Sequence, residues 1–130
     1  MTEESRNPHI NALPSYQKAI IPPEKLEKYL LNPKHTAHVW GKSSGKDKAL
    51  VFKSALGFDQ SNWELLRDRI LEELPYHEAL VGEEDQYGKR YNVTLPIEGA
   101  NGNIVNVLTA WIIRPKEDSP RFVTARCLKP

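Results

Sequence analysis

The chain has 130 residues, of which 39% are hydrophobic and 27% charged, a balance that is typical of a globular protein and excludes a disordered one. Its formal net charge of +1 at pH 7 excludes a strongly basic nucleic-acid-binding domain, so any polyanion site must be a local patch. One cysteine excludes an internal disulfide, and no apolar run is long enough to span a membrane, so we expect a cytoplasmic protein with no membrane partner.

Helical patterns fill the first half of the chain. A flexible, polar N-terminal arm is expected over residues 1–12 and a single α+β domain over residues 13–130, with a short strand at 15–21. A helix begins at Pro23 and ends at an Asn-Pro pair. Two further helices end at Gly57 and Pro75, and the second of them carries an apolar stripe at helical spacing.

The second half alternates apolar and polar residues, as strands do. Strands are predicted over 90–95, 104–113 and 121–128, and the apolar residues on both faces of 104–113 place that strand at the centre of a sheet. The acidic run 83–85 fits a solvated turn. Because the helices precede the strands, the predicted fold is α+β, with N-terminal helices packed on a C-terminal antiparallel β-sheet.

The loop from Asn32 to Gly45 and the helix start that follows it carry the best candidate residues for function. The loop holds two histidines, His35 and His38, and the helix start holds Lys46 and Lys48. Histidine, with a pKa of about 6.5, suits acid–base work near neutral pH, and a helix N-terminus favours an anion. These residues therefore fit a phosphate site, although a solvated basic loop explains the same pattern.

Several short stretches, taken in order, resemble one bacterial domain family. They lie at residues 29–35, 45–49, 55–58, 85–91, 99–102, 109–112 and 120–125. The family is an uncharacterised domain found at the C-termini of contact-dependent and filamentous-haemagglutinin-type toxins. The resemblance implies a fold of the group that includes barnase, EndoU, colicin and RelE-like ribonucleases.

The resemblance also implies a function and a set of residues. The function is a metal-independent ribonuclease with RNA as substrate, no cofactor, and an immunity or antitoxin protein as partner. For that function, the candidate catalytic residues are His35, Lys48, Thr109 and Thr124, and the candidate substrate-binding residues are His38, Lys46, Trp111 and Arg121. His35 matches an Asn-Pro-x-His frame and His38 matches the spacing to Gly41, so either histidine fits the family position.

Two kinds of alternative stay open. Thr109 and Trp111 share one face of a predicted strand, and a position in the core explains Trp111 better than a substrate contact does. Arg126 fits the role of a phosphate clamp as well as Arg121 does. For the whole chain, a non-catalytic binding or regulatory module of the same fold, or an inhibitor resembling an immunity protein, fits the near-neutral charge.

Overall fold

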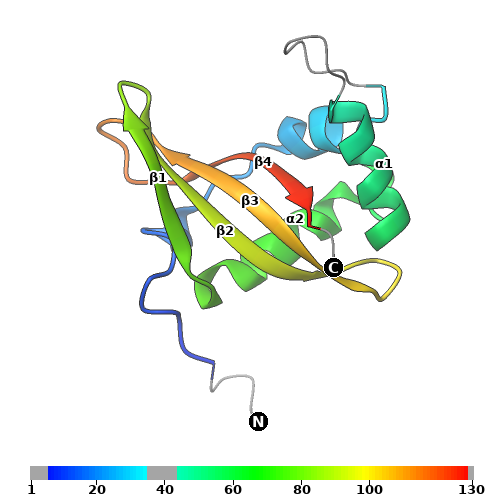
Figure 1. The fold of residues 1–130 in the computed structure, drawn as a ribbon, viewed down its shortest axis with the longest axis horizontal. Coiled ribbons are helices and arrows are strands. Elements are labelled where there is room, and N and C mark those ends of the chain that lie inside the picture. The colour runs from blue at the N-terminus through cyan, green and yellow to red at the C-terminus, as the bar shows by residue number, and fades with distance from the viewer. Residues whose placement is uncertain (1–5, 35–43, 129–130) are drawn as a thin grey trace.

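An antiparallel sheet forms the second half of the chain. The computed structural model describes residues 6–34 and 44–128, apart from the side chains of residues 44–47. The sheet has four strands in chain order: β1 (Ala79–Asp85), β2 (Gly88–Glu98), β3 (Ile104–Ile113) and β4 (Arg121–Cys127) (Figure 1). Each strand pairs antiparallel with the next. The predicted α+β fold is confirmed, as is the central position of the strand over 104–113.

The helical elements precede the sheet. They are two α-helices, α1 (Ser44–Leu56) and α2 (Trp63–Glu73), the π-helix η3 (Lys25–Leu30), and the 3-10 turns η2 (Tyr16–Lys18), η4 (Gln60–Asn62) and η5 (Leu74–Tyr76). In Figure 1, α2 lies behind the sheet and α1 lies beside β4. The helices thus pack on one face of the sheet and at its β4 edge.

The core lies between α2 and the facing side of the sheet. On β2, alternate residues are buried, from Tyr91 through Val93 and Leu95 to Ile97, and α2 contributes Leu66 and Ile70. Full burial of one such aliphatic side chain stabilises a fold by about 1.5–3 kcal/mol. Tyr91, Val93 and Leu95 of this row predicted the strand over 90–95, but the structure continues the strand through Pro96 to Glu98. The row also fixes which face of the sheet is inside.

Two local predictions are wrong. Residues 15–21 form no strand: Ser15 has a φ of 57°, η2 follows it, and only Ile20 makes a bridge, parallel to Arg121. Conversely, the acidic run 83–85 belongs to β1 instead of a turn. β1 is an edge strand exposed along almost its whole length, so it lacks the alternation that reveals a strand in sequence.

The last strand departs from strict alternation. Ala110 pairs with Thr124 but Trp111 pairs with Phe122, so Val123 is an extra residue that shifts the register. This bulge places Phe122 on the buried face together with Ala125, whereas uninterrupted alternation would place Phe122 with Thr124. Phe122 then meets Trp111 edge to face, with their ring centroids 5.6 Å apart.

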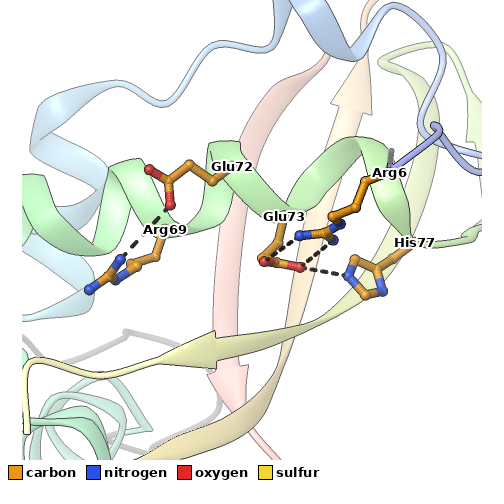
Figure 2. A network of polar contacts seen from close by, with 5 residues as sticks. All are labelled: Arg6, Arg69, Glu72, Glu73 and His77. Atoms are coloured by element: carbon orange, nitrogen blue, oxygen red, sulfur yellow. Dashed lines mark hydrogen bonds and ion pairs between the residues drawn. The ribbon is translucent and has the colours of Figure 1, made fainter. Parts of the chain in front are cut away.

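The N-terminal segment packs along the folded domain. The Arg6 guanidinium binds the Glu73 carboxylate at 3.2 Å and lies 3.8 Å from the centre of the Tyr76 ring. Glu73 also contacts His77 Nε2 at 2.9 Å (Figure 2). Burial alone would raise the pKa of Glu73, but the hydrogen bonds from Arg6 and His77 outweigh burial and lower it. The N-terminal segment is therefore held against the end of α2 through Arg6.

Candidate functional site

Lys48 lies on the inward face of α1. The helix begins at Ser44, so Lys48 is in its second turn, and Phe52 and Leu56 follow at intervals of four residues on the same face. Both of these residues are fully buried. The spacing that buries Phe52 and Leu56 therefore also directs Lys48 towards the sheet, while Lys53 on the same helix is exposed.

The Lys48 ammonium contacts β4. Its Nζ donates a hydrogen bond to Thr124 Oγ1 at 3.2 Å, and Arg126 lies on the same strand two residues further on. Burial lowers the pKa of Lys48, and the nearby positive charge of Arg126 lowers it further. The structure thus brings a half-buried ammonium, a hydroxyl and a guanidinium together at one place on the β4 side of the sheet.

The β2–β3 hairpin fixes the other end of α1. The Asn101 backbone N–H donates to the Leu56 carbonyl at 3.3 Å. The side-chain amides of Asn101 and Asn103 each donate to the Ala55 carbonyl, also at 3.3 Å. These bonds satisfy carbonyls that a helix end leaves without partners. These contacts fix the position of α1 beside the sheet, and in that position the Lys48 side chain reaches Thr124.

Close backbone packing at Gly99 gives a stability prediction. A Cβ at Gly99 would lie 2.2 Å from the Leu56 carbonyl oxygen. We expect Gly99→Ala to lower the free energy of unfolding by about 1–3 kcal/mol, because either the hairpin or α1 must move. Urea denaturation measures this loss. Gly82→Ala is the matched control, since its Cβ would make only ordinary contacts, and an equal loss in both variants would contradict the prediction.

Thr109 and Trp111 lie on the buried face of β3. The Thr109 hydroxyl donates to the Val93 carbonyl at 2.7 Å and accepts from Trp111 Nε1 at 2.8 Å. Both side chains are fully buried, and the prediction that they share a face is confirmed. Their polar atoms bond to each other and to the backbone, and neither offers a group to solvent.

Thr124 faces the opposite way. Its partner in the ladder is Ala110, the neighbour of Thr109, and successive residues of a strand point to opposite faces. Thr109 is instead paired with Ala125, which is buried. The two threonines that the sequence singled out are therefore on adjacent strands but on different faces of the sheet. Only Thr124 lies with Lys48.

The remaining predicted residues divide into two groups. Arg121 shares the Thr124 face by register, is partly buried, and donates from Nε to Glu117 at 3.3 Å. His35 and His38 lie outside the described residues, as does the side chain of Lys46. Of the two arginines that fit a phosphate clamp, Arg126 is the one whose charge acts on Lys48.

The open face of the sheet continues from this cluster across β3 and β2. Ala110 and Leu108 are partly buried there, and Asn92 and Thr94 are exposed. The cluster of Lys48, Thr124 and Arg126, which we call the β4 cationic site, consists of hydrogen-bond donors and two positive charges. Such a set suits an anion such as a carboxylate or a phosphate group.

Residues 12–129 match the family model DUF6883, described as a domain of unknown function. The chain belongs to this family. A solved structure, a contact-dependent growth inhibition toxin–immunity protein complex from Klebsiella pneumoniae 342, contains a chain of similar fold, with a TM-score of 0.67 and 15% identity. The match covers 88% of the present chain and 97% of that chain. No curated protein matches the sequence.

These findings support part of the expectation drawn from sequence. The family match gives the expected uncharacterised domain, and the fold occurs in a solved toxin–immunity complex. At 15% identity, the similarity is one of fold. Among the described residues, no helix is long and apolar enough to cross a membrane.

Proposed function

We propose that this chain is a toxin-type ribonuclease domain that cleaves RNA without a metal ion, and that the β4 cationic site is part of its active site. The contact between Lys48 Nζ and Thr124 Oγ1 carries the proposal. It joins the helix that follows the histidine-containing loop to a strand of the open sheet face. The partner that would control such an activity is an immunity protein.

The chemistry of RNA cleavage calls for groups of this kind. Attack by the 2′-hydroxyl needs a base, departure of the 5′-oxygen needs an acid, and the phosphorane between them needs positive charge. Lys48 and Arg126 supply the positive charge, and Thr124 supplies a hydroxyl to a phosphate oxygen. His35 is the proposed acid–base group, with His38 as the alternative, because their loop runs directly into α1.

A second candidate is a non-catalytic module of the same fold, such as a regulatory or immunity-like protein. The net charge of +1 favours it, because the whole molecule offers little attraction for RNA. The related solved structure is a complex of a toxin with an immunity protein, so a chain of this fold is compatible with either role. An activity assay separates the two candidates.

Expression in bacteria and cleavage in vitro test the proposal. The induced wild-type chain is expected to arrest growth and degrade RNA, and the purified chain should cleave RNA with excess chelator present. His35→Ala should abolish both effects if His35 is the acid–base group, and His38→Ala should do so if His38 holds that place. His9→Ala is the matched control, since His9 is exposed and lies outside the loop.

The outcomes are distinct. A folded wild-type chain that neither arrests growth nor cleaves RNA would contradict the ribonuclease proposal and favour the non-catalytic module. Cleavage that survives in both loop variants would remove the histidines from the mechanism. Cleavage lost equally in His9→Ala would show that unfolding explains the effect, which thermal unfolding of each variant measures directly.

A further inference from the structure

β1 forms a free edge of the sheet on the side away from the β4 cationic site. It is the first strand in the order β1-β2-β3-β4, and every residue after Ala79 is exposed. Two of these are large apolar side chains, Leu80 at 60% and Val81 at 64% exposure. Edge strands of soluble proteins usually avoid such residues, because an open apolar edge attracts other strands.

Hydrogen-bond directions show which backbone groups of β1 point outward. The Ala79 N–H donates to the Asn11 carbonyl at 2.8 Å, on the side away from β2. Residues two apart on an antiparallel strand direct their N–H and C=O groups to the same side. The Val81 N–H and C=O therefore also point away from β2. On that side, a turn of the N-terminal segment contacts β1 through the bond between Asn11 and Ala79.

A groove lies beside these groups. Ile10, Pro14, Leu80 and Val81 contribute its apolar lining, and Glu78 lies at the same end of β1. Ile10 is almost fully exposed. The side chains of an extended segment paired with Val81 could therefore contact this apolar lining.

The other half of β1 is acidic. Glu83 and Glu84 are exposed and form no ion pair with any residue of 6–34 or 44–128, whereas the neighbouring Asp85 binds Arg90 at 2.8 Å. Two unpaired carboxylates next to two exposed apolar side chains are complementary to a segment with two cations next to two apolar residues.

A second copy of this chain fits the edge poorly. Antiparallel pairing of two β1 strands about Gly82 would set Glu83 against Val81 and Glu84 against Leu80. Pairing about Glu83 would bring that carboxylate against its own copy. Pairing about Val81, whose N–H and C=O point outward, would set Glu84 against Glu78 and would need Ala79, whose N–H already binds Asn11. In these registers, carboxylates face apolar residues or each other, which is unfavourable.

We propose that the outer edge of β1 binds an extended segment of a partner protein as a fifth strand, with apolar residues beside Leu80 and Val81 and Lys or Arg beside Glu83 and Glu84. The backbone of such a segment would bind at Val81, and its side chains would give specificity. Because β1 and β4 are opposite edges of the sheet, this partner leaves the β4 cationic site open. The proposal does not depend on ribonuclease activity.

Titration of the full chain with a short peptide tests this inference. The probe is acetyl-Lys-Lys-Thr-Val-Ile-amide, which runs antiparallel to β1 with its lysines beside Glu83 and Glu84, where the β1–β2 register shifts. It ends before Ala79, whose N–H is bound to Asn11. In amide NMR spectra, we expect shifts confined to β1, the Ile10–Pro14 segment and β2, with slower hydrogen exchange at Val81. The control peptide carries Glu-Glu in place of Lys-Lys and should bind at least about threefold more weakly.

Two variants connect the binding to particular groups. Val81→Pro removes the outward N–H and should weaken the basic peptide about fivefold or more, since one backbone hydrogen bond is lost. Glu83→Gln with Glu84→Gln should weaken it about threefold to tenfold, and the matched control Glu98→Gln, an exposed acid on β2, should not. The glutamine variants alter exposed side chains only, so they remain informative even if Val81→Pro fails to fold.

Several results would overturn the proposal. Equal binding of the basic and acidic peptides would show that the carboxylates of β1 do not contribute to recognition. Chemical shift changes centred away from β1 would show that the peptide binds another surface. Concentration-dependent dimerisation abolished by Val81→Pro would show that the occupant is a second copy. Ribonuclease activity has no part in any of these measurements, so the two proposals succeed or fail separately.

Discussion

Replacing Lys48 with methionine is expected to slow RNA cleavage by about 100-fold or more, the loss seen when one preorganised donor is removed from a site of developing negative charge. Methionine keeps the length and the apolar stem of the side chain but removes the ammonium that reaches Thr124 Oγ1. Single-turnover cleavage of a defined RNA in excess chelator measures the effect. Lys53→Met, an exposed change on the same helix, is the matched control and should leave the rate unchanged.

The pH dependence of the same variants separates charge from proton transfer. Because burial and Arg126 lower the pKa of Lys48, the ammonium loses its proton at a lower pH than an exposed lysine does. The wild-type rate should therefore fall as the pH rises through that lowered pKa. Arginine stays charged throughout, so Lys48→Arg should shift this decline upwards if positive charge is what matters.

Other outcomes would point elsewhere. If Lys48→Arg is as slow as Lys48→Met, proton transfer or shape at this position outweighs charge. Full activity in Lys48→Met would remove the β4 cationic site from the mechanism, although a ribonuclease acting through another site would survive. An equal loss in Lys53→Met would indicate a nonspecific effect of lysine removal on RNA binding.

Trp111→Ala is expected to lower the free energy of unfolding by about 3–5 kcal/mol, the usual cost of removing a large buried aromatic side chain. Trp111 is fully buried, packs edge to face on Phe122, and donates from its indole to Thr109. Urea denaturation followed by circular dichroism measures the loss. In a domain of ordinary stability, a loss of this size is a large part of the total free energy of unfolding.

Thr109→Val tests whether this buried pair has a role beyond packing. The change keeps the shape but leaves the Trp111 indole N–H without its acceptor, which costs about 1–3 kcal/mol. Cleavage by the folded fraction should be unchanged, because Thr109 lies on the face opposite Thr124. Unchanged stability together with lost cleavage would contradict this and return Thr109 to the active site.

Much of the fold follows from local patterns in the sequence. The row of Tyr91, Val93 and Leu95 and the apolar run over 104–113 predicted two strands that the structure contains, although the first strand continues past Pro96 to Glu98. The stripe on α2 predicted its buried face. β1 escaped prediction because a strand exposed on both faces carries no periodic signal. The bulge at Val123 was not predicted either, because an extra residue in one strand is recognised only from its pairing with the neighbouring strand.

The sequence by itself determined the α+β class, the order of helices before strands and the residue types of an anion site, because periodicity and composition are local properties of the chain. Only the tertiary structure decided which of those residues meet. Lys48 and Thr124 are 76 positions apart, and they touch because the hairpin asparagines fix the end of α1 while the bulged β4 presents Thr124 on the open face. Thr109, equally prominent in the sequence, lies inside the core, because the strand register sends its side chain to the other face.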